Sequence, residues 1–184
     1  MARTLSNMLP LGTKAPNFEL MDTVSGKRLP LPQLKGNQAT VIMFICNHCP
    51  FVIHVNPILV AMAKQYKDLG VRFIAISSND AKNYPQDGPA EMKEHAKENQ
   101  YPFPYLYDET QEIAKAYDAA CTPDFYVFNA DLLLVYRGQL DDSRPGNGVA
   151  VTGLDLHHAL DCVLNKTENT KLQKPSIGCN IKWK

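Results

Sequence analysis

The chain has 184 residues, 45% of them hydrophobic and 21% charged, which is typical of one soluble domain with a substantial core. Its 19 basic and 19 acidic residues cancel, which argues against a nucleic-acid partner. The longest apolar run, residues 41–46, is too short to span a bilayer, and the N-terminus lacks the apolar stretch of a secretory signal. We expect a single domain over residues 1–184, located in the cytoplasm, with no membrane partner.

The predicted elements alternate between strands and helices. Continuous apolar and β-branched runs indicate strands buried on both faces, whereas apolar residues at helical spacing indicate helices. The expected strands are residues 17–20, 39–45, 71–77, 124–129 and 132–137, and the expected helices are residues 51–69, 89–99, 110–118 and 154–164. Their order, βαβ and then ββα, predicts an α/β sandwich with a mixed central sheet.

The two ends of the chain carry weaker patterns. Residues 1–15 show no clear period, and residues 165–184 carry five lysines against one glutamate. A charged segment of this kind is usually solvated. We therefore expect both segments to be loosely attached to the domain.

Two cysteines, Cys46 and Cys49, stand where the first buried strand should end and a helix should begin. The free N–H groups and positive partial charge of a helix N-terminus stabilise an anion, and the thiolate is the reactive form of cysteine. The spacing allows a small disulfide to close and reopen. We expect an enzyme in which Cys46 attacks a substrate disulfide and Cys49 resolves the mixed disulfide.

The two residues between the cysteines, Asn47 and His48, are expected to tune the pair. His48 can donate a hydrogen bond or place a positive charge near Cys46; the alternative is a histidine on an exposed turn. A structural zinc site needs four ligands, usually from two close pairs. Because the remaining cysteines have no second short spacing, we expect neither a metal nor an organic cofactor.

Residues 46–52, with the sequence CNHCPFV, resemble the active-site segment of thioredoxin-like proteins in the alkyl hydroperoxide reductase/thiol-specific antioxidant (AhpC/TSA) superfamily. The match is closest to the peroxiredoxin-like branch often labelled thiol-disulfide isomerase or thioredoxin. Supporting segments lie at residues 12–18, 76–80, 121–125, 136–138, 141–142 and 176–179. The resemblance implies a thioredoxin fold, three α/β/α layers around a mixed central sheet, with an N-terminal β extension and an insertion after the first βαβ unit.

The resemblance also implies a substrate-binding wall opposite the cysteines. Pro123 matches the cis-proline of the fold, and Thr122 would present its backbone to an incoming peptide or thiol. Cys121 would then lie close to the pair, as a third redox thiol or as a small buried one. The implied substrates are disulfides and thiols of proteins or small molecules, and the implied reductant is an unidentified thioredoxin- or glutathione-type molecule. A homodimer is possible on the same resemblance.

We expect different roles for the remaining cysteines, Cys162 and Cys179. Cys162 lies among apolar residues of the closing helix, so core packing is expected. Cys179, in a tail expected to be loose, is either an incidental free thiol or the source of a mixed or intermolecular disulfide.

The main expectation is disulfide exchange with a general antioxidant role. The sequence departs from the family patterns at several positions, which leaves two alternative functions. The first is a peroxiredoxin-type peroxidase with Cys46 as the peroxidatic cysteine, although neither cysteine fits Pro-x-x-x-Thr-x-x-Cys and the usual late arginine is missing. The second is a non-catalytic Cu(I)-binding protein, although copper-delivery relatives space their cysteines differently. Thr40 also replaces the buried aspartate that thioredoxins use in proton transfer.

Overall fold

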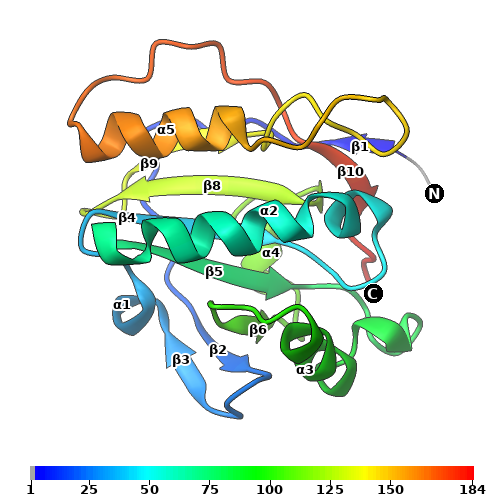
Figure 1. The fold of residues 1–184 in the computed structure, drawn as a ribbon. Helices are drawn as coiled ribbons and strands as arrows, with labels where there is room; N and C mark the ends of the chain where they lie inside the picture. Colours follow the sequence, from blue (N-terminus) through cyan, green and yellow to red (C-terminus); the bar gives the residue numbers. More distant parts are fainter. Residues whose placement is uncertain (1–2) are drawn as a thin grey trace.

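The computed structural model describes residues 3–184, and its elements follow the predicted order of a βαβ unit and then a ββα unit (Figure 1). The strands are β1 (Arg3–Leu5), β2 (Glu19–Asp22), β3 (Arg28–Pro30), β4 (Ala39–Phe44), β5 (Val71–Ser77), β6 (Tyr105–Tyr107), β7 (Cys121–Thr122), β8 (Asp124–Asn129), β9 (Leu134–Gly138) and β10 (Ile177–Asn180). The helices are α1 (Leu31–Leu34), α2 (Pro50–Tyr66), α3 (Pro89–Glu98), α4 (Glu112–Ala116) and α5 (Leu154–Leu164), with short 3₁₀ turns η1 (Lys67–Leu69) and η2 (Pro85–Asp87).

The central sheet has seven strands in the order β3-β2-β6-β5-β4-β8-β9. It is mixed, as predicted, because β4 pairs parallel with β5 and antiparallel with β8. Every residue of β4 is buried, since successive side chains point to opposite faces and both faces are covered. Val41 and Met43 belong to one hydrophobic core, whereas Ile42 and Phe44 belong to the other.

Helices cover both faces of this sheet, which produces three layers. Core residues of α2, α3 and α5 join the cluster that contains Val41, and those of α1 and α4 join the opposite one. In Figure 1, α2 and α5 lie side by side over the strands, and α4 lies behind them. α2 begins with Pro50 in its first turn, where no hydrogen bond is lost, and the 3₁₀ turn after it ends at Gly70 in the left-handed conformation.

The expected N-terminal extension and insertion are both present. β2 and β3 form an antiparallel hairpin at one edge of the central sheet. The insertion after β5 contributes η2, α3 and β6, and β6 pairs with both β5 and β2. The sequence did not predict β6, because three residues are too few to show a strand period. No helix among residues 3–184 has the length and apolar composition needed to cross a membrane.

The prediction that both chain ends are loosely attached was wrong. β1 pairs antiparallel with β10, and β10 pairs antiparallel with β7, so the two ends and β7 form a second, three-stranded sheet. In the tail, Cys179 and Ile181 are only 2% and 1% exposed. The lysines led to the prediction of a solvated tail. The short apolar segment of the tail is instead stabilised by pairing with β1 and β7, which are remote in sequence.

Candidate active site

The cysteine pair lies where the sequence predicted, at the junction of β4 and α2. Cys46 follows β4 by two residues, and Cys49 is the N-cap of α2, where its carbonyl oxygen accepts the N–H groups of Val52 and Ile53 at 3.0 Å each. Both cysteines are almost fully buried, whereas the two residues between them are half-buried. The loop between the cysteines therefore forms the accessible side of the pair.

The two thiols contact each other and the wall opposite them. Each thiol shifts the pKa of the other, upward for Cys46 and downward for Cys49. Cys46 Sγ lies 3.5 Å from Thr122 Oγ1, and Cys49 Sγ lies 3.1 Å from the Thr122 carbonyl oxygen. The Thr122–Pro123 peptide bond is cis, as the resemblance implied. Thr122 therefore contacts both sulfur atoms.

The two thiols have pKa values shifted in opposite directions, so the pair loses one proton readily and retains the other. The hydrogen bond from Cys46 lowers the pKa of Cys49 to about 5. The same contact, with burial and the negative charge of Asp87, raises the pKa of Cys46 well above its ordinary value. The reduced pair therefore carries one negative charge near neutral pH, shared along one hydrogen bond.

This arrangement predicts the pH dependence of thiol reactivity. Because the first proton leaves with a pKa of about 5, the rate of alkylation by iodoacetamide should be almost constant between about pH 6.5 and 8 and should fall below about pH 5. An ordinary thiol, with a pKa of about 8.5, slows about tenfold per pH unit over the same range. The Cys162→Ser protein is the control and should give the same profile. A midpoint near pH 8.5 would contradict the shared proton.

The insertion after β5 supplies an acidic group to the active-site loop. Asp87, fully buried at the end of η2, accepts the Asn47 N–H at 2.9 Å through Oδ1. Its Oδ2 lies 2.7 Å from His48 Nδ1 and accepts the Asn79 side-chain amide at 2.8 Å. The His48 ring also stacks on Tyr84, with the planes 5° apart. His48 is thus held by the insertion rather than standing on an exposed turn.

Asn47 is held by the insertion as well. Its side-chain amide donates to the Gln86 carbonyl oxygen at 2.8 Å, and its Oδ1 accepts the Tyr105 hydroxyl at 3.0 Å. Both residues between the cysteines are therefore fixed by one structural unit. The sequence carried no motif for Asp87, so its place beside them was not predicted.

Cys46, His48 and Asp87 place candidate metal-ligand atoms within 4.8 Å of one another. Two ligands of one tetrahedral zinc ion would stand about 3.3 Å apart, given metal–ligand distances of about 2.0 Å. The His48 and Asp87 atoms are only 2.7 Å apart, which is the distance of a direct ion pair or hydrogen bond. The arrangement fits a contact within the protein better than a coordination sphere.

The third cysteine at the pair is Cys179, which the sequence placed in a loose tail. Its sulfur lies 2.9 Å from Cys49 Sγ. Cys121 points elsewhere: its sulfur lies 3.7 Å from the Pro123 carbonyl oxygen, and burial raises its pKa. The glycine–cysteine pattern of residues 178–179 was the one signal in the sequence that could have identified this contact.

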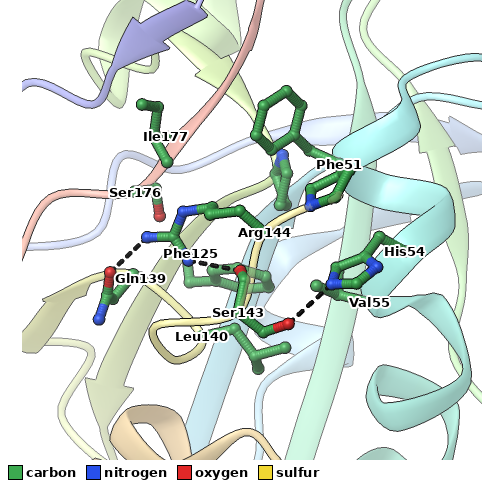
Figure 2. A pocket seen from close by; sticks show the side chains of 12 residues that line it. Phe51, His54, Val55, Phe125, Gln139, Leu140, Ser143, Arg144, Ser176 and Ile177 are labelled. Carbon is green, nitrogen blue, oxygen red and sulfur yellow. Dashed lines mark hydrogen bonds between the residues drawn. The ribbon is translucent and has the colours of Figure 1, made fainter. Parts of the chain in front are cut away.

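A small pocket of about 20 Å³ is lined by Pro123, by residues of α2 and by the loop after β9 (Figure 2). Phe51, from the first turn of α2, lines it together with Arg144. The Arg144 guanidinium donates to the carbonyl oxygens of Asp141 and Ser143, both at 2.6 Å, so the loop is held by its own bonds. The pocket offers a mainly apolar surface beside Pro123 and the first turn of α2.

Two positions that bear on the alternatives have structural roles. Thr40 is fully buried, and its hydroxyl accepts the Gly36 N–H at 3.0 Å. Arg137 is also fully buried, and its guanidinium donates to Asp124 at 3.3 Å and to Tyr126 at 3.0 Å. Arg137 therefore neutralises a buried carboxylate, where a peroxidase of this fold would need an arginine beside the reactive sulfur.

The sequence profile of the AhpC/TSA family matches residues 11–137, which include Cys46, Cys49 and the cis-proline. The chain belongs to the AhpC/TSA family. The solved structure of a conserved protein from Geobacillus kaustophilus has 60% identity and a TM-score of 0.98, covering 100% of this chain and 97% of that one.

Two further relatives of this AhpC/TSA protein carry descriptive names. The thiol-disulfide oxidoreductase ResA of Bacillus thuringiensis subsp. konkukian is 25% identical over 128 residues, which are 70% of this chain and 69% of the relative. The thioredoxin domain of a Bacteroides vulgatus thiol-disulfide oxidoreductase has 17% identity and a TM-score of 0.59, over 71% of this chain and 89% of that one. The second match shows the fold alone and confirms the expected thioredoxin fold.

Proposed function

We propose that this AhpC/TSA protein is a thiol–disulfide oxidoreductase whose redox centre is the pair Cys46 and Cys49. The observation that carries the proposal is the placement of both cysteines at the N-terminus of α2, with each sulfur in contact with Thr122 at the cis bond before Pro123. The name of the Bacillus relative agrees with this chemistry. We further propose a cytoplasmic setting, in which thiol pools keep the pair reduced.

The reaction begins at Cys46. Its thiolate attacks one sulfur of a substrate disulfide, forms a mixed disulfide, and releases the other substrate sulfur as a thiolate that takes up a proton. Cys49 then attacks Cys46 Sγ, which closes the Cys46–Cys49 disulfide and releases the second substrate thiol. Two electrons pass from the protein to the substrate, and a thioredoxin- or glutathione-type reductant returns them.

The surroundings support this division of roles. Cys49 is enclosed by Thr122 and Cys179, whereas Cys46 precedes the half-buried residues Asn47 and His48. Shifting the shared proton from Cys46 to Cys49 makes Cys46 the nucleophile without placing a second charge on the pair. A substrate that reaches Cys46 can rest on the loop and on the pocket beside Phe51.

The Cys49→Ser protein tests the order of the two steps. Without the resolving thiol, the mixed disulfide on Cys46 should accumulate, because attack by Cys49 no longer removes it. Incubation with a model disulfide should give the adduct at Cys46 by peptide mass spectrometry, whereas the wild-type protein should return to the Cys46–Cys49 disulfide. An adduct on any other cysteine would contradict the assignment.

Reaction rates of the wild-type protein distinguish the oxidoreductase from the peroxidase alternative. Stopped-flow fluorescence would follow the fully reduced wild-type protein with hydrogen peroxide and, separately, with the model disulfide. We expect the peroxide rate of a simple thiol and fast disulfide exchange, because Arg137 is occupied by Asp124. A peroxide rate orders of magnitude above that of a free thiol would replace the proposal with a peroxidase.

A further inference from the structure

The contact between Cys49 and Cys179 places a third thiol on the interior side of the pair. The two sulfur atoms are 2.9 Å apart, and a disulfide bond is about 2.05 Å long, so less than an ångström of movement separates contact from bonding. Cys179 is 2% exposed, so it faces the pair rather than solvent. Cys49 thus has a thiol on each side, Cys46 and Cys179.

The backbone of β10 holds Cys179 in this place. Cys179 stands opposite Thr122 in the antiparallel register of β10 and β7. A Cβ atom added to Gly178 would lie 2.0 Å from the Thr122 carbonyl oxygen and 2.7 Å from its carbonyl carbon. Only glycine allows the two strands to approach this closely, and that approach brings Cys179 against Cys49.

The position of β10 is also the position of a substrate strand. The resemblance implied that Thr122 presents its backbone to an incoming peptide, but β10 occupies that edge, where Cys179 pairs with Thr122, so the backbone of Thr122 is not open to a substrate strand while β10 is in place. The chain's own C-terminal strand therefore presents a cysteine to the redox pair from the side where a bound peptide would present one.

We propose that Cys179 is a third redox-active cysteine, which exchanges with Cys49 and moves the disulfide from Cys46–Cys49 to Cys49–Cys179. The proposal rests on the proposed dithiol function, which forms the first disulfide. Cys179 attacks Cys49 Sγ, the Cys49–Cys179 bond forms, and the Cys46–Cys49 bond breaks. The proton of Cys179 ends on the Cys46 sulfur, so no electron leaves the protein.

The consequence is that an oxidised protein regains a free Cys46. The disulfide is stored on the buried side, and Cys46 is available for a further thiol or disulfide. Burial and the hydrogen bond to Cys49 raise the pKa of Cys179 to about 12 in the reduced protein, so Cys179 stays protonated there. Cys179 has a disulfide to attack only after Cys49 has been oxidised, and the part of the pKa shift that Cys49 causes is lost at that stage.

Tryptic peptides separate the two disulfides. Cys46 and Cys49 share the peptide of residues 36–64, which contains no internal lysine or arginine, whereas Cys179 lies in residues 172–182. The full-length protein would be oxidised with one equivalent of diamide, capped with N-ethylmaleimide at acidic pH, digested and weighed. A Cys46–Cys49 disulfide stays within one peptide, and a Cys49–Cys179 disulfide joins the two.

We expect joined peptides in at least about a tenth of the oxidised wild-type protein, since the two disulfides interconvert by exchange. The Cys46→Ser protein should form the joined peptides almost completely, because the competing disulfide is removed. The Cys179→Ser protein should form only the internal disulfide, and Cys162→Ser, a cysteine on α5, should match the wild type.

Two results would overturn the relay. If the wild-type protein gives only the internal disulfide, and Cys46→Ser leaves Cys49 and Cys179 both capped, Cys179 takes no part in exchange and the Cys46–Cys49 function stands. If the oxidised wild-type protein holds neither the internal disulfide nor the joined peptides, the proposed function fails and the relay fails with it.

Discussion

The Cys46→Ser protein should lose disulfide exchange by a factor on the order of 10³ or more, because a hydroxyl replaces the sulfur that attacks the substrate. Ser is close in size to Cys, and position 46 packs in a buried environment, so the fold should be retained. The measurement is the rate at which the reduced protein reacts with a model disulfide, with far-ultraviolet circular dichroism to check the fold.

The matched control is Cys162→Ser. Cys162 lies on α5, 3.6 Å from His158, and takes no part in the contacts of the redox pair. Its substitution should leave the exchange rate within a factor of about two. Full exchange activity in the Cys46→Ser protein would overturn Cys46 as the nucleophile and would point to Cys49, the thiol with the lowered pKa.

The Arg137→Ala protein should lose about 3–5 kcal/mol of unfolding free energy. Arg137 is fully buried and donates to Asp124, Tyr126 and the carbonyl oxygen of Asp118. Burial raises the pKa of Asp124 to about 7 even beside Arg137, so removal of the guanidinium leaves a buried carboxyl group that must take up a proton or remain without a compensating charge. Urea unfolding followed by fluorescence gives the free energy directly.

Two further variants separate charge from packing. Arg28→Ala removes a solvent-exposed ion pair with Glu19 and should cost no more than about 1 kcal/mol. The double variant Arg137→Met with Asp124→Leu replaces both members of the buried pair and should recover most of the loss, because no buried charge is left unpaired. A loss below about 1 kcal/mol for Arg137→Ala would show that the pair contributes little.

Local sequence patterns determined the central part of this fold. The runs at residues 71–77, 124–129 and 154–164 match β5, β8 and α5 residue for residue. These elements are long, and each is buried on one or both faces, so their apolar periods are strong. The register of β7 and β10 had no such signal, since it depends on pairing between segments more than fifty residues apart.

The candidate active site likewise combines features that the sequence predicted with features that it did not. The placement of Cys46 and Cys49 at a strand–helix junction could be read from the chain itself, because the strand, the spacing and the helix are adjacent in sequence. The cis bond before Pro123 came from the resemblance to a known family and was confirmed. Asp87 and Cys179 were not foreseen, although both contact the active-site loop or its cysteines.

The sequence by itself therefore determined the α/β architecture and the position of the cysteine pair at a strand–helix junction, because both depend on short-range patterns of apolar residues and on residues adjacent in sequence. Only the tertiary structure decided what surrounds the pair. The insertion brings Asp87 to His48, and the close approach that Gly178 permits brings Cys179 to Cys49. Such contacts join segments far apart along the chain, and the packing of the whole sheet fixes them.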